Sequence, residues 1–103
     1  MQAHILKAEL HYLNGNIDAA QTEYLVSIKA AHEHKYLHYE ALAYELHGMF
    51  LIENSMPDEG VGQLRVALDK YKLWGANRKV KELEDFMDVI DPTHLRSKLK
   101  VRI

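Results

Sequence analysis

One helix ends and another begins within the stretch Tyr71-Lys72-Leu73-Trp74-Gly75-Ala76-Asn77-Arg78-Lys79-Val80-Lys81-Glu82-Leu83. Gly75 lies between two amphipathic segments, and glycine is the residue that most readily adopts the left-handed conformation with which many helices end. The only tryptophan of the chain, Trp74, immediately precedes this glycine. We therefore expect a tight corner between two packed helices at this point.

The rest of the chain has the same helical pattern. Apolar residues recur at intervals of three and four almost throughout, and only 2 prolines and 5 glycines interrupt them. We predict an all-α fold without β-strands. The predicted helices cover residues 2–13, 17–33, 38–53, 56–74 and 76–89, and a short last helix that opens at Asp91-Pro92 leads into a basic tail, within 91–103.

Turn and cap residues separate the predicted helices. Asn14-Gly15 offers a left-handed stop, and Asn16 can cap the second helix. Ser55 precedes Pro57 and Asp58, a combination typical of a helix start, so Ser55 is predicted to cap the fourth helix. The third helix has apolar residues on more than one side, which predicts a central position.

A constant offset of forty residues relates the two halves of the chain. Five pairs of positions match: Ala8 with Gly48, Gly15 with Ser55, Ala20 with Gly60, Tyr24 with Leu64, and Ser27 with Ala67. Small side chains at such places let two helices approach closely. We predict two helical hairpins, residues 2–36 and 38–74, followed by a closing helix, 76–89, stacked as a solenoid.

These hairpins resemble tetratricopeptide repeats (TPRs) in a divergent form. Gly15-Asn16-Ile17-Asp18-Ala19-Ala20 stands where that family has a Gly-Asp-Tyr-x-x-Ala turn, although the family repeats at about 34 residues. Two other stretches, residues 41–46 and 71–83, resemble the helical-repeat region of large multidomain sensor kinases. The signature positions are Tyr71, Trp74, Gly75, Ala76, Lys79, Val80 and Leu83. Two positions depart from that pattern, since the family usually has Gly at the turn Asn54-Ser55 and Ala at Gly60.

The resemblance implies a right-handed TPR-like solenoid that acts in protein–protein interaction. Those kinases combine an AAA-type ATPase, helical repeats, a GAF domain and a histidine kinase, and the repeats join the ATPase and sensory halves. The first hypothesis is therefore a non-catalytic connector module of a signal-transduction ATPase or histidine kinase. The alternative is a free-standing adaptor that binds a peptide or a helix in its concave groove.

The resemblance carries over architecture and no catalytic residues. The sequence has no Gly-rich Lys-Ser/Thr loop, no phosphoacceptor histidine motif and no nucleotide-binding glycine box. No second carboxylate, nucleophile or phosphate loop is placed with Glu9 or Glu45, as acid–base chemistry would need. We expect neither enzyme activity nor a cofactor.

Composition favours protein partners. The chain has 13 Lys and Arg against 15 Asp and Glu, a net charge of −2, so no overall positive field attracts nucleic acid or an anionic membrane. It has no cysteine, and no apolar run reaches the roughly 20 residues that span a bilayer. We expect a cytoplasmic protein whose partner is an adjacent domain, a peptide or a second copy of the chain, the last giving a homo-oligomer. We expect it neither to bind nucleic acid nor to insert into a membrane.

The 7 histidines raise the hypothesis of a metal-binding helical protein. His32, His34 and His38 lie close together in the sequence, and imidazoles on adjacent turns can share Zn²⁺ or Ni²⁺. However, side chains two residues apart diverge on a helix, and His34 and His38 flank a predicted turn. We therefore favour surface histidines and predict no metal site.

The concave groove of the repeat array is the predicted binding site. The resemblance to tetratricopeptide repeats implies that its lining comes from the first helix of each hairpin: Ile5, Glu9, Tyr12, Leu13, Leu42, Glu45, Met49 and Ile52. An apolar surface with carboxylates suits a basic helix or extended peptide. For Glu45 two interpretations stay open, an anchor for a partner or a carboxylate that pairs with a nearby cation or tyrosine.

Two further features allow more than one interpretation. Trp74 could be an exposed anchor, but we expect it to pack between the fourth and fifth helices, with Val80 and Leu83 closing over it. The basic tail could contact nucleic acid or phospholipid, or it could lead into another domain.

Overall fold

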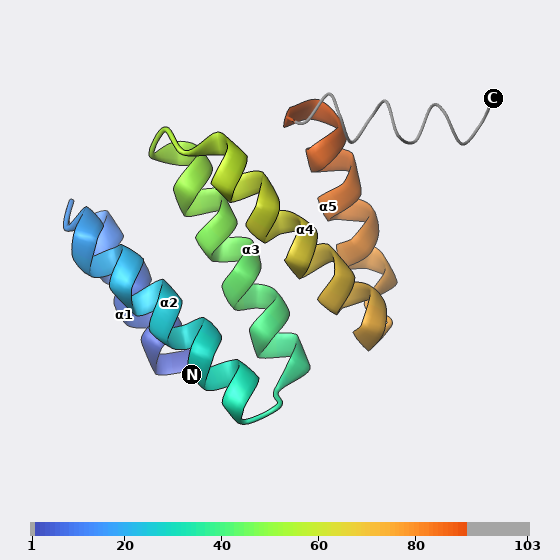
Figure 1. Cartoon of the computed structure of the whole chain (residues 1–103), viewed down its shortest axis with the longest axis horizontal. Coiled ribbons are helices and arrows are strands. Elements are labelled where there is room, and N and C mark those ends of the chain that lie inside the picture. The colour runs from blue at the N-terminus through green and yellow to red at the C-terminus, as the bar shows by residue number, and fades with distance from the viewer. Residues whose placement is uncertain (1, 91–103) are drawn as a thin grey trace.

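Five helices form the part of the chain that the structure describes, residues 2–90 (Figure 1). In this computed structural model they are α1 (Gln2–Leu13), α2 (Ile17–Glu33), α3 (Leu37–Glu53), α4 (Pro57–Trp74) and α5 (Asn77–Ile90). For residues 2–90 the all-α prediction is confirmed, and the predicted bounds of these five helices lie within one residue of the observed ones. The predicted last helix and basic tail lie outside the described residues.

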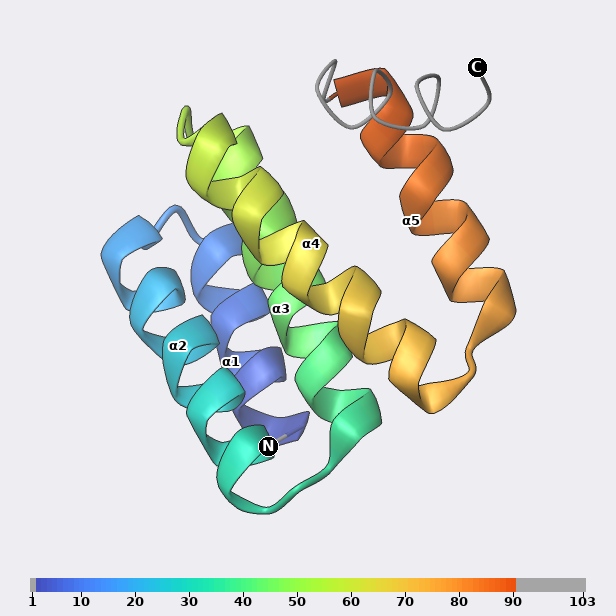
Figure 2. The same ribbon diagram turned by 45° about the vertical axis from the view of Figure 1, so that its right-hand side comes forward.

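Each helix packs against the helix that follows it in the chain, and successive helices run in opposite directions (Figures 1 and 2). α3 lies between α2 and α4. Its buried residues are Glu40, Ala41, Ala43, His47, Gly48, Phe50 and Leu51. Because these residues surround most of the helix, α3 is the central helix, as its apolar pattern predicts.

The apolar core has two parts, one on each side of α3. The first joins α1, α2 and α3 through Ala8, Ala20, Tyr24, Phe50 and Leu51. The second joins α3, α4 and α5 through Ala41, Leu64, Ala67, Leu68, Tyr71, Leu83 and Met87. The central helix therefore contributes to both parts.

The four turns between the described helices share one geometry and recur every twenty residues. Gly15, Lys35, Ser55 and Gly75 have φ of 79°, 57°, 67° and 82°, the left-handed conformation. After each of them, a backbone N–H bonds to a carbonyl oxygen five residues back: Asn16 to His11, Tyr36 to Ala31, Met56 to Leu51, and Ala76 to Tyr71. This bond is typical of the Schellman helix ending. One helix and one turn thus take twenty residues, which accounts for the forty-residue offset of the hairpins.

The caps differ from the prediction. Ser55 does not cap α4, because Met56 precedes that helix and Ser55 lies within the turn with φ 67°. The reason is the common turn geometry, which gives Ser55 the position that Gly75 holds in the next turn. Asn16 precedes α2 as predicted, but its side chain makes no capping hydrogen bond.

Residues forty positions apart have matching surroundings. Four pairs are buried: Ala8 and Gly48, Ala20 and Gly60, Tyr24 and Leu64, and Ser27 and Ala67. Gly48 and Gly60 face each other where α3 crosses α4. The small residues therefore lie at helix crossings, as the sequence predicts.

Candidate functional site

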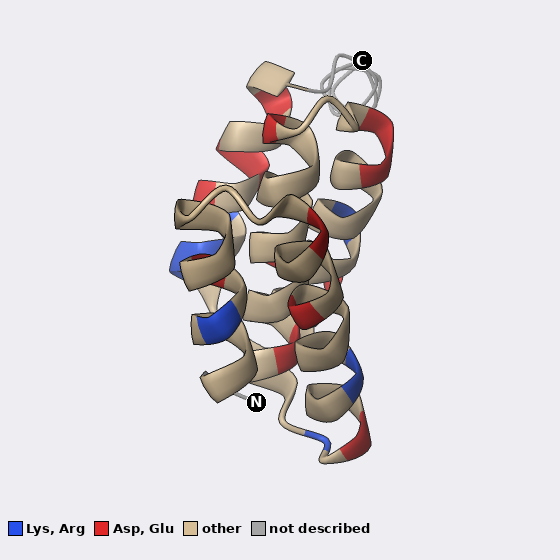
Figure 3. Ribbon diagram, turned by 90° about the vertical axis from the view of Figure 1, so that its left-hand side faces the viewer, with Lys and Arg blue, Asp and Glu red and all other residues tan. Residues whose placement is uncertain are grey.

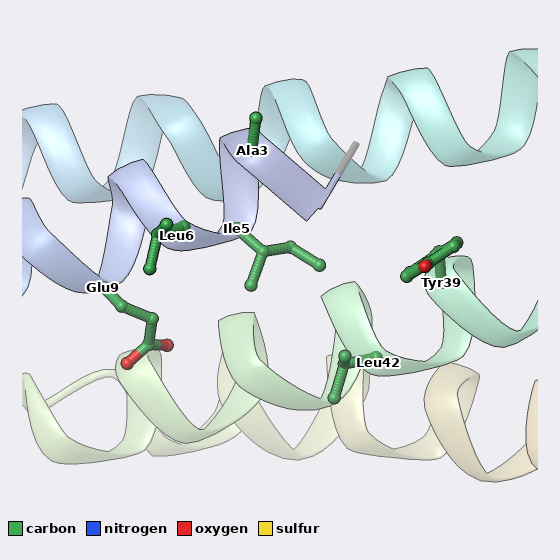
Figure 4. A pocket seen from close by; sticks show the side chains of 6 residues that line it. All are labelled: Ala3, Ile5, Leu6, Glu9, Tyr39 and Leu42. Carbon is green, nitrogen blue, oxygen red and sulfur yellow. The ribbon is translucent and has the colours of Figure 1, made fainter.

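A hollow of about 450 Å³ lies between α1 and α3 (Figure 4). Its lining residues are Ala3, Ile5, Leu6, Glu9, Tyr39 and Leu42. Ile5 and Glu9 extend from α1 toward α3, where Leu42 and Tyr39 line the other side. Leu6 is 61% exposed, so apolar surface is open to solvent here. We call this the α1–α3 hollow.

A second hollow of about 280 Å³ has three carboxylates in its lining, and we call it the acidic hollow. Its lining residues are Glu9, Tyr12, Tyr24, Glu45, Leu46, Met49, Phe50 and Glu53.

Tyrosine hydroxyls hold two of these carboxylates in place. Tyr24 Oη donates to Glu9 Oε1 at 2.6 Å, and Tyr12 Oη donates to Glu53. The hydrogen bond that Tyr12 donates to Glu53 raises the pKa of Tyr12, while burial and the bond to Glu9 raise the pKa of Tyr24. Both phenols are therefore neutral hydrogen-bond donors to their carboxylates.

A third hollow of about 330 Å³ is lined by His38, Tyr39, Leu42, Tyr71, Trp74 and Lys79, and we call it the aromatic hollow. The His38 and Trp74 rings lie 5.4 Å apart between centroids, and His38 and Tyr39 lie 4.3 Å apart. The Nζ atom of Lys79 lies 5.5 Å from the centroid of the Tyr71 ring, within the range of a cation–π contact. The result is an apolar hollow with one cation at its edge.

The three hollows adjoin one another. Glu9 lines both the α1–α3 hollow and the acidic hollow, while Tyr39 and Leu42 line both the α1–α3 hollow and the aromatic hollow. They form one surface along α1 and α3 that reaches α5 at Lys79, and we call this surface the groove. Its apolar residues can desolvate a partner's side chains, and its carboxylates can accept hydrogen bonds from cations.

Glu45 links three helices. Its Oε1 accepts a hydrogen bond of 2.7 Å from Tyr71 Oη on α4, and Lys79 Nζ on α5 lies 3.1 Å from its carboxylate. Burial and the bond to Glu45 raise the pKa of Tyr71, so its phenol is the donor. Of the two interpretations left open, the structure shows the pairing of Glu45 with a cation and a tyrosine. Its side chain is nevertheless 19% exposed and still lines the acidic hollow.

Most of the predicted groove residues do line these hollows: Ile5, Glu9, Tyr12, Leu42, Glu45 and Met49. Leu13 and Ile52 line none of the three. Leu13 is the last residue of α1 and is 82% exposed, while Ile52 packs against Gly60 of α4. Both were assigned to the groove by analogy with tetratricopeptide repeats, and that analogy could not define the rotation of each helix.

The predicted packing of Trp74 between α4 and α5 is wrong. Trp74 is the last residue of α4 and is 51% exposed, with its ring beside His38 of α3 and Tyr71. The residues of α4 that join the core with Leu83 are Tyr71 and residues N-terminal to it. Trp74 lies beyond this contact and belongs to the aromatic hollow instead.

The other signature residues have structural roles. Tyr71 and Leu83 are core residues, and Ala76 and Val80 pack at the edge of the same cluster. Gly75 has φ 82°, and Lys79 pairs with Glu45. The signature stretch therefore makes the α4–α5 corner, and the side chains of Tyr71, Trp74 and Lys79 also line the aromatic hollow.

Sequence reasoning missed a row of buried polar side chains on α3. Glu40 and His47 are 4% and 3% exposed. Glu40 Oε1 lies 2.5 Å from Lys70 Nζ of α4, and Oε2 lies 3.0 Å from His32 Nδ1 of α2. The twenty-residue period could have predicted this burial, because Glu40 lies twenty residues after Ala20 and twenty before Gly60, and both of those residues are buried.

His47 bridges the same two helices. Its Nε2 lies 2.7 Å from Gln21 Oε1 of α2, and its Nδ1 lies 2.8 Å from Gln63 Nε2 of α4. Burial lowers the pKa of His47, which favours the neutral ring. The neutral tautomer with its proton on Nε2 satisfies both contacts, because it donates to Gln21 and accepts from Gln63.

The histidines singled out for metal binding are separated. His32 pairs with Glu40, His38 lies beside Trp74, and the His34 ring lies 6.4 Å from that of Tyr36. Within residues 2–90 no group of three or more His, Asp or Glu side chains is placed to hold a metal ion.

None of the described helices has the length and apolar character needed to cross a bilayer. Comparison of the chain with protein-family models, with curated proteins and with solved structures found no match.

Proposed function

We propose that the chain is a non-catalytic TPR-like module that binds a helix or an extended peptide in the groove. The observation that carries the proposal is the continuity of the groove, whose hollows share Glu9, Tyr39 and Leu42. A partner segment can therefore contact carboxylates, aliphatic side chains and exposed aromatic rings along one surface. Helix-in-groove recognition uses this combination of apolar anchors and a few charged groups.

The regular turns support the repeat architecture in this proposal. Helix and turn recur every twenty residues, and each helix packs on the next, which is the construction rule of a solenoid. The resemblance to sensor-kinase repeats favours a segment of an adjacent signalling domain, in the cytoplasm, as the occupant.

A free-standing adaptor is the second candidate, and Trp74 favours it. A half-exposed tryptophan beside His38 and Tyr39 offers the kind of aromatic contact that dominates many peptide-binding sites. Both candidates use the groove. They differ in whether the segment is joined to the array or arrives on another chain.

Selection of random 16-residue peptides against the full chain tests the groove. Peptides that bind should bind Leu42→Asp at least about tenfold more weakly, because Leu42 lines two of the hollows. The matched control is Leu25→Asp on α2, a leucine 48% exposed that lines none of the three. Equal binding by wild type and Leu42→Asp, with both proteins folded, would contradict the proposal.

Trp74 supplies an internal readout, since it is the only tryptophan. A segment in the aromatic hollow should protect Trp74 from acrylamide quenching. If a peptide whose binding is weakened by Leu42→Asp leaves the acrylamide quenching of Trp74 unchanged, the peptide binds in the other hollows.

A further inference from the structure

The charge of the chain is divided unevenly. Residues 1–90 carry 9 Lys and Arg against 14 Asp and Glu, a net charge of −5, while residues 91–103 carry 4 against 1, a net charge of +3. Figure 3 shows more acidic than basic segments along the helices. The helical array and the basic segment 91–103 therefore attract each other electrostatically.

Two carboxylates of the acidic hollow have no cationic partner among residues 2–90. Glu40 pairs with Lys70 and Glu45 pairs with Lys79. By contrast, within residues 2–90 the hydrogen-bond partners of Glu9 and Glu53 are Tyr24 and Tyr12, and no Lys, Arg or His pairs with either. These two carboxylates present uncompensated charge to the groove, beside the apolar side chain of Met49.

The acidic hollow and the start of the basic segment lie at the same end of the array. α1, α3 and α5 run in the same direction in Figures 1 and 2, so their C-terminal ends lie on the same side. Glu53 is the last residue of α3, and Ile90, the last of α5, immediately precedes the basic segment. α3 and α5 both pack against α4, and the axes of packed helices lie about 8–10 Å apart, so thirteen residues, which can extend up to about 45 Å, are long enough to reach α3.

We propose that residues 91–103 of the same chain occupy the acidic hollow. Cations of the segment pair with Glu9 and Glu53, and its apolar residues, among them Leu95 and Leu99, cover the aliphatic side of the hollow at Met49. The proposal rests on the proposed function, because it names an occupant for one part of the groove. It also adds regulation, since a partner segment must displace residues 91–103 to reach the carboxylates.

Tethering makes this contact effective although each exposed ion pair is weak. Covalent attachment through a short tether gives an effective concentration of millimolar order, so weak affinity suffices for docking within one chain. A partner segment that also binds in the aromatic hollow gains contacts there, so it can still displace residues 91–103 from the acidic hollow. The contact should weaken in salt, because screening acts strongly on exposed charges.

Disulfide trapping tests the proposal, because the chain has no cysteine and two introduced thiols are the only ones. We expect Met49→Cys with Ser97→Cys to form an intramolecular disulfide on the order of tenfold faster than Leu25→Cys with Ser97→Cys. Met49 lines the acidic hollow, whereas Leu25 on α2 lines none of the three hollows. Half-molar NaCl should remove the difference. Equal rates for the two pairs, or disulfide-linked dimers as the main product, would overturn the proposal.

Charge neutralisation separates attraction from mere proximity. Glu9→Gln and Glu53→Gln remove both charges and leave each tyrosine a hydrogen-bond acceptor. In this background the Met49→Cys and Ser97→Cys pair should form its disulfide only as fast as the Leu25→Cys and Ser97→Cys control pair. Neutralising Arg96, Lys98, Lys100 and Arg102 to Gln, which leaves the described helices unaltered, should do the same. Unchanged trapping in both backgrounds would contradict docking by charge. The peptide test with Leu42→Asp is independent, so the groove proposal can stand when this one fails.

Discussion

A Cβ atom on Gly60 would lie 2.6 Å from the carbonyl oxygen of Gly48, and a Cβ atom on Gly48 would lie 2.8 Å from the carbonyl oxygen of Gly60. Side-chain atoms essentially never approach a backbone oxygen this closely, so the α3–α4 crossing requires both residues to lack a side chain. The equivalent positions of the first hairpin are Ala8 and Ala20, which are fully buried. The crossing of the second hairpin therefore leaves no room for the alanines that the first hairpin has at the equivalent positions.

Alanine at either glycine should destabilise the protein. For Gly48→Ala and Gly60→Ala we expect a loss of at least about 1 kcal/mol in the free energy of unfolding, because overpacking outweighs the gain in helix propensity. Gly62→Ala is the control, since Gly62 lies in α4 with nothing within 4 Å of its Cβ position. That change should stabilise by roughly 0.5–1 kcal/mol. Urea denaturation gives all three values, and a common sign would contradict the close crossing.

Lys70 neutralises a buried carboxylate, so its removal should be costly. Lys70→Met leaves Glu40, which is 4% exposed, with His32 as its remaining partner, and we expect a loss of about 2 kcal/mol. Lys72→Met is the control, because Lys72 pairs with Glu84 at 3.3 Å with 52% of its side chain exposed. Its cost should stay below about 1 kcal/mol. Equal midpoints of denaturation for the two variants would count against a buried ion pair.

Stability should fall in mildly acidic solution because of His47. Burial lowers the pKa of His47 in the folded state, so the unfolded state binds a proton first as the pH falls. The contribution is fully present above the unfolded pKa of about 6.5 and is lost between that pH and the lower folded pKa. Denaturation of wild type and His47→Gln from pH 8 to pH 5 measures it. Parallel curves for the two proteins would show that His47 is not responsible.

Leu64 and Trp74 should respond differently to truncation. Leu64 is fully buried between α3 and α4, so Leu64→Ala should cost about 2–5 kcal/mol. Trp74 is 51% exposed, so Trp74→Ala should cost well below the roughly 3–5 kcal/mol of a buried aromatic residue. Thermal melting compares the two. A larger loss for Trp74→Ala would restore the packing interpretation and weaken the aromatic hollow as a binding surface.

Ser55 is a site for stabilisation. It adopts φ 67°, which costs a residue with a Cβ atom about 1 kcal/mol more than glycine. Ser55→Gly should therefore raise the free energy of unfolding by up to about 1 kcal/mol. Gly75→Ala is the converse test at φ 82°, and it should lower stability by a similar amount. A loss on Ser55→Gly would mean that the hydroxyl makes a larger contribution than the backbone strain.

Sequence reasoning predicted helices well because several signals agree at their ends. The left-handed residues Gly15 and Gly75 interrupt a strong apolar period, and the bounds follow from both. Ser55 misled the prediction of a cap, because a serine beside Pro57 matches a cap motif and gives no sign of its positive φ. Only the twenty-residue spacing of the turns shows that Ser55 occupies the left-handed position that Gly15 and Gly75 occupy in their turns.

The candidate site was harder to predict, since it depends on how each helix is rotated. Glu9 and Met49 line the acidic hollow, whereas Ile52 faces α4. Glu40 and His47 were missed because polar residues usually lie on the solvent side of an amphipathic helix. Their burial depends on partners from α2 and α4, which are distant in the sequence.

The position of α3 between two helices makes its residue count inflexible. One residue inserted midway between Glu40 and Glu45 would turn the two side chains by about 100° relative to each other. Glu40 could then keep its ion pair with Lys70 only if Glu45 lost its contacts with Tyr71 and Lys79. Equally, Glu45 could keep those contacts only if Glu40 lost Lys70. Natural variation in length should therefore be found at the turns, in steps that keep the next helix in phase, while α3 itself keeps a constant length.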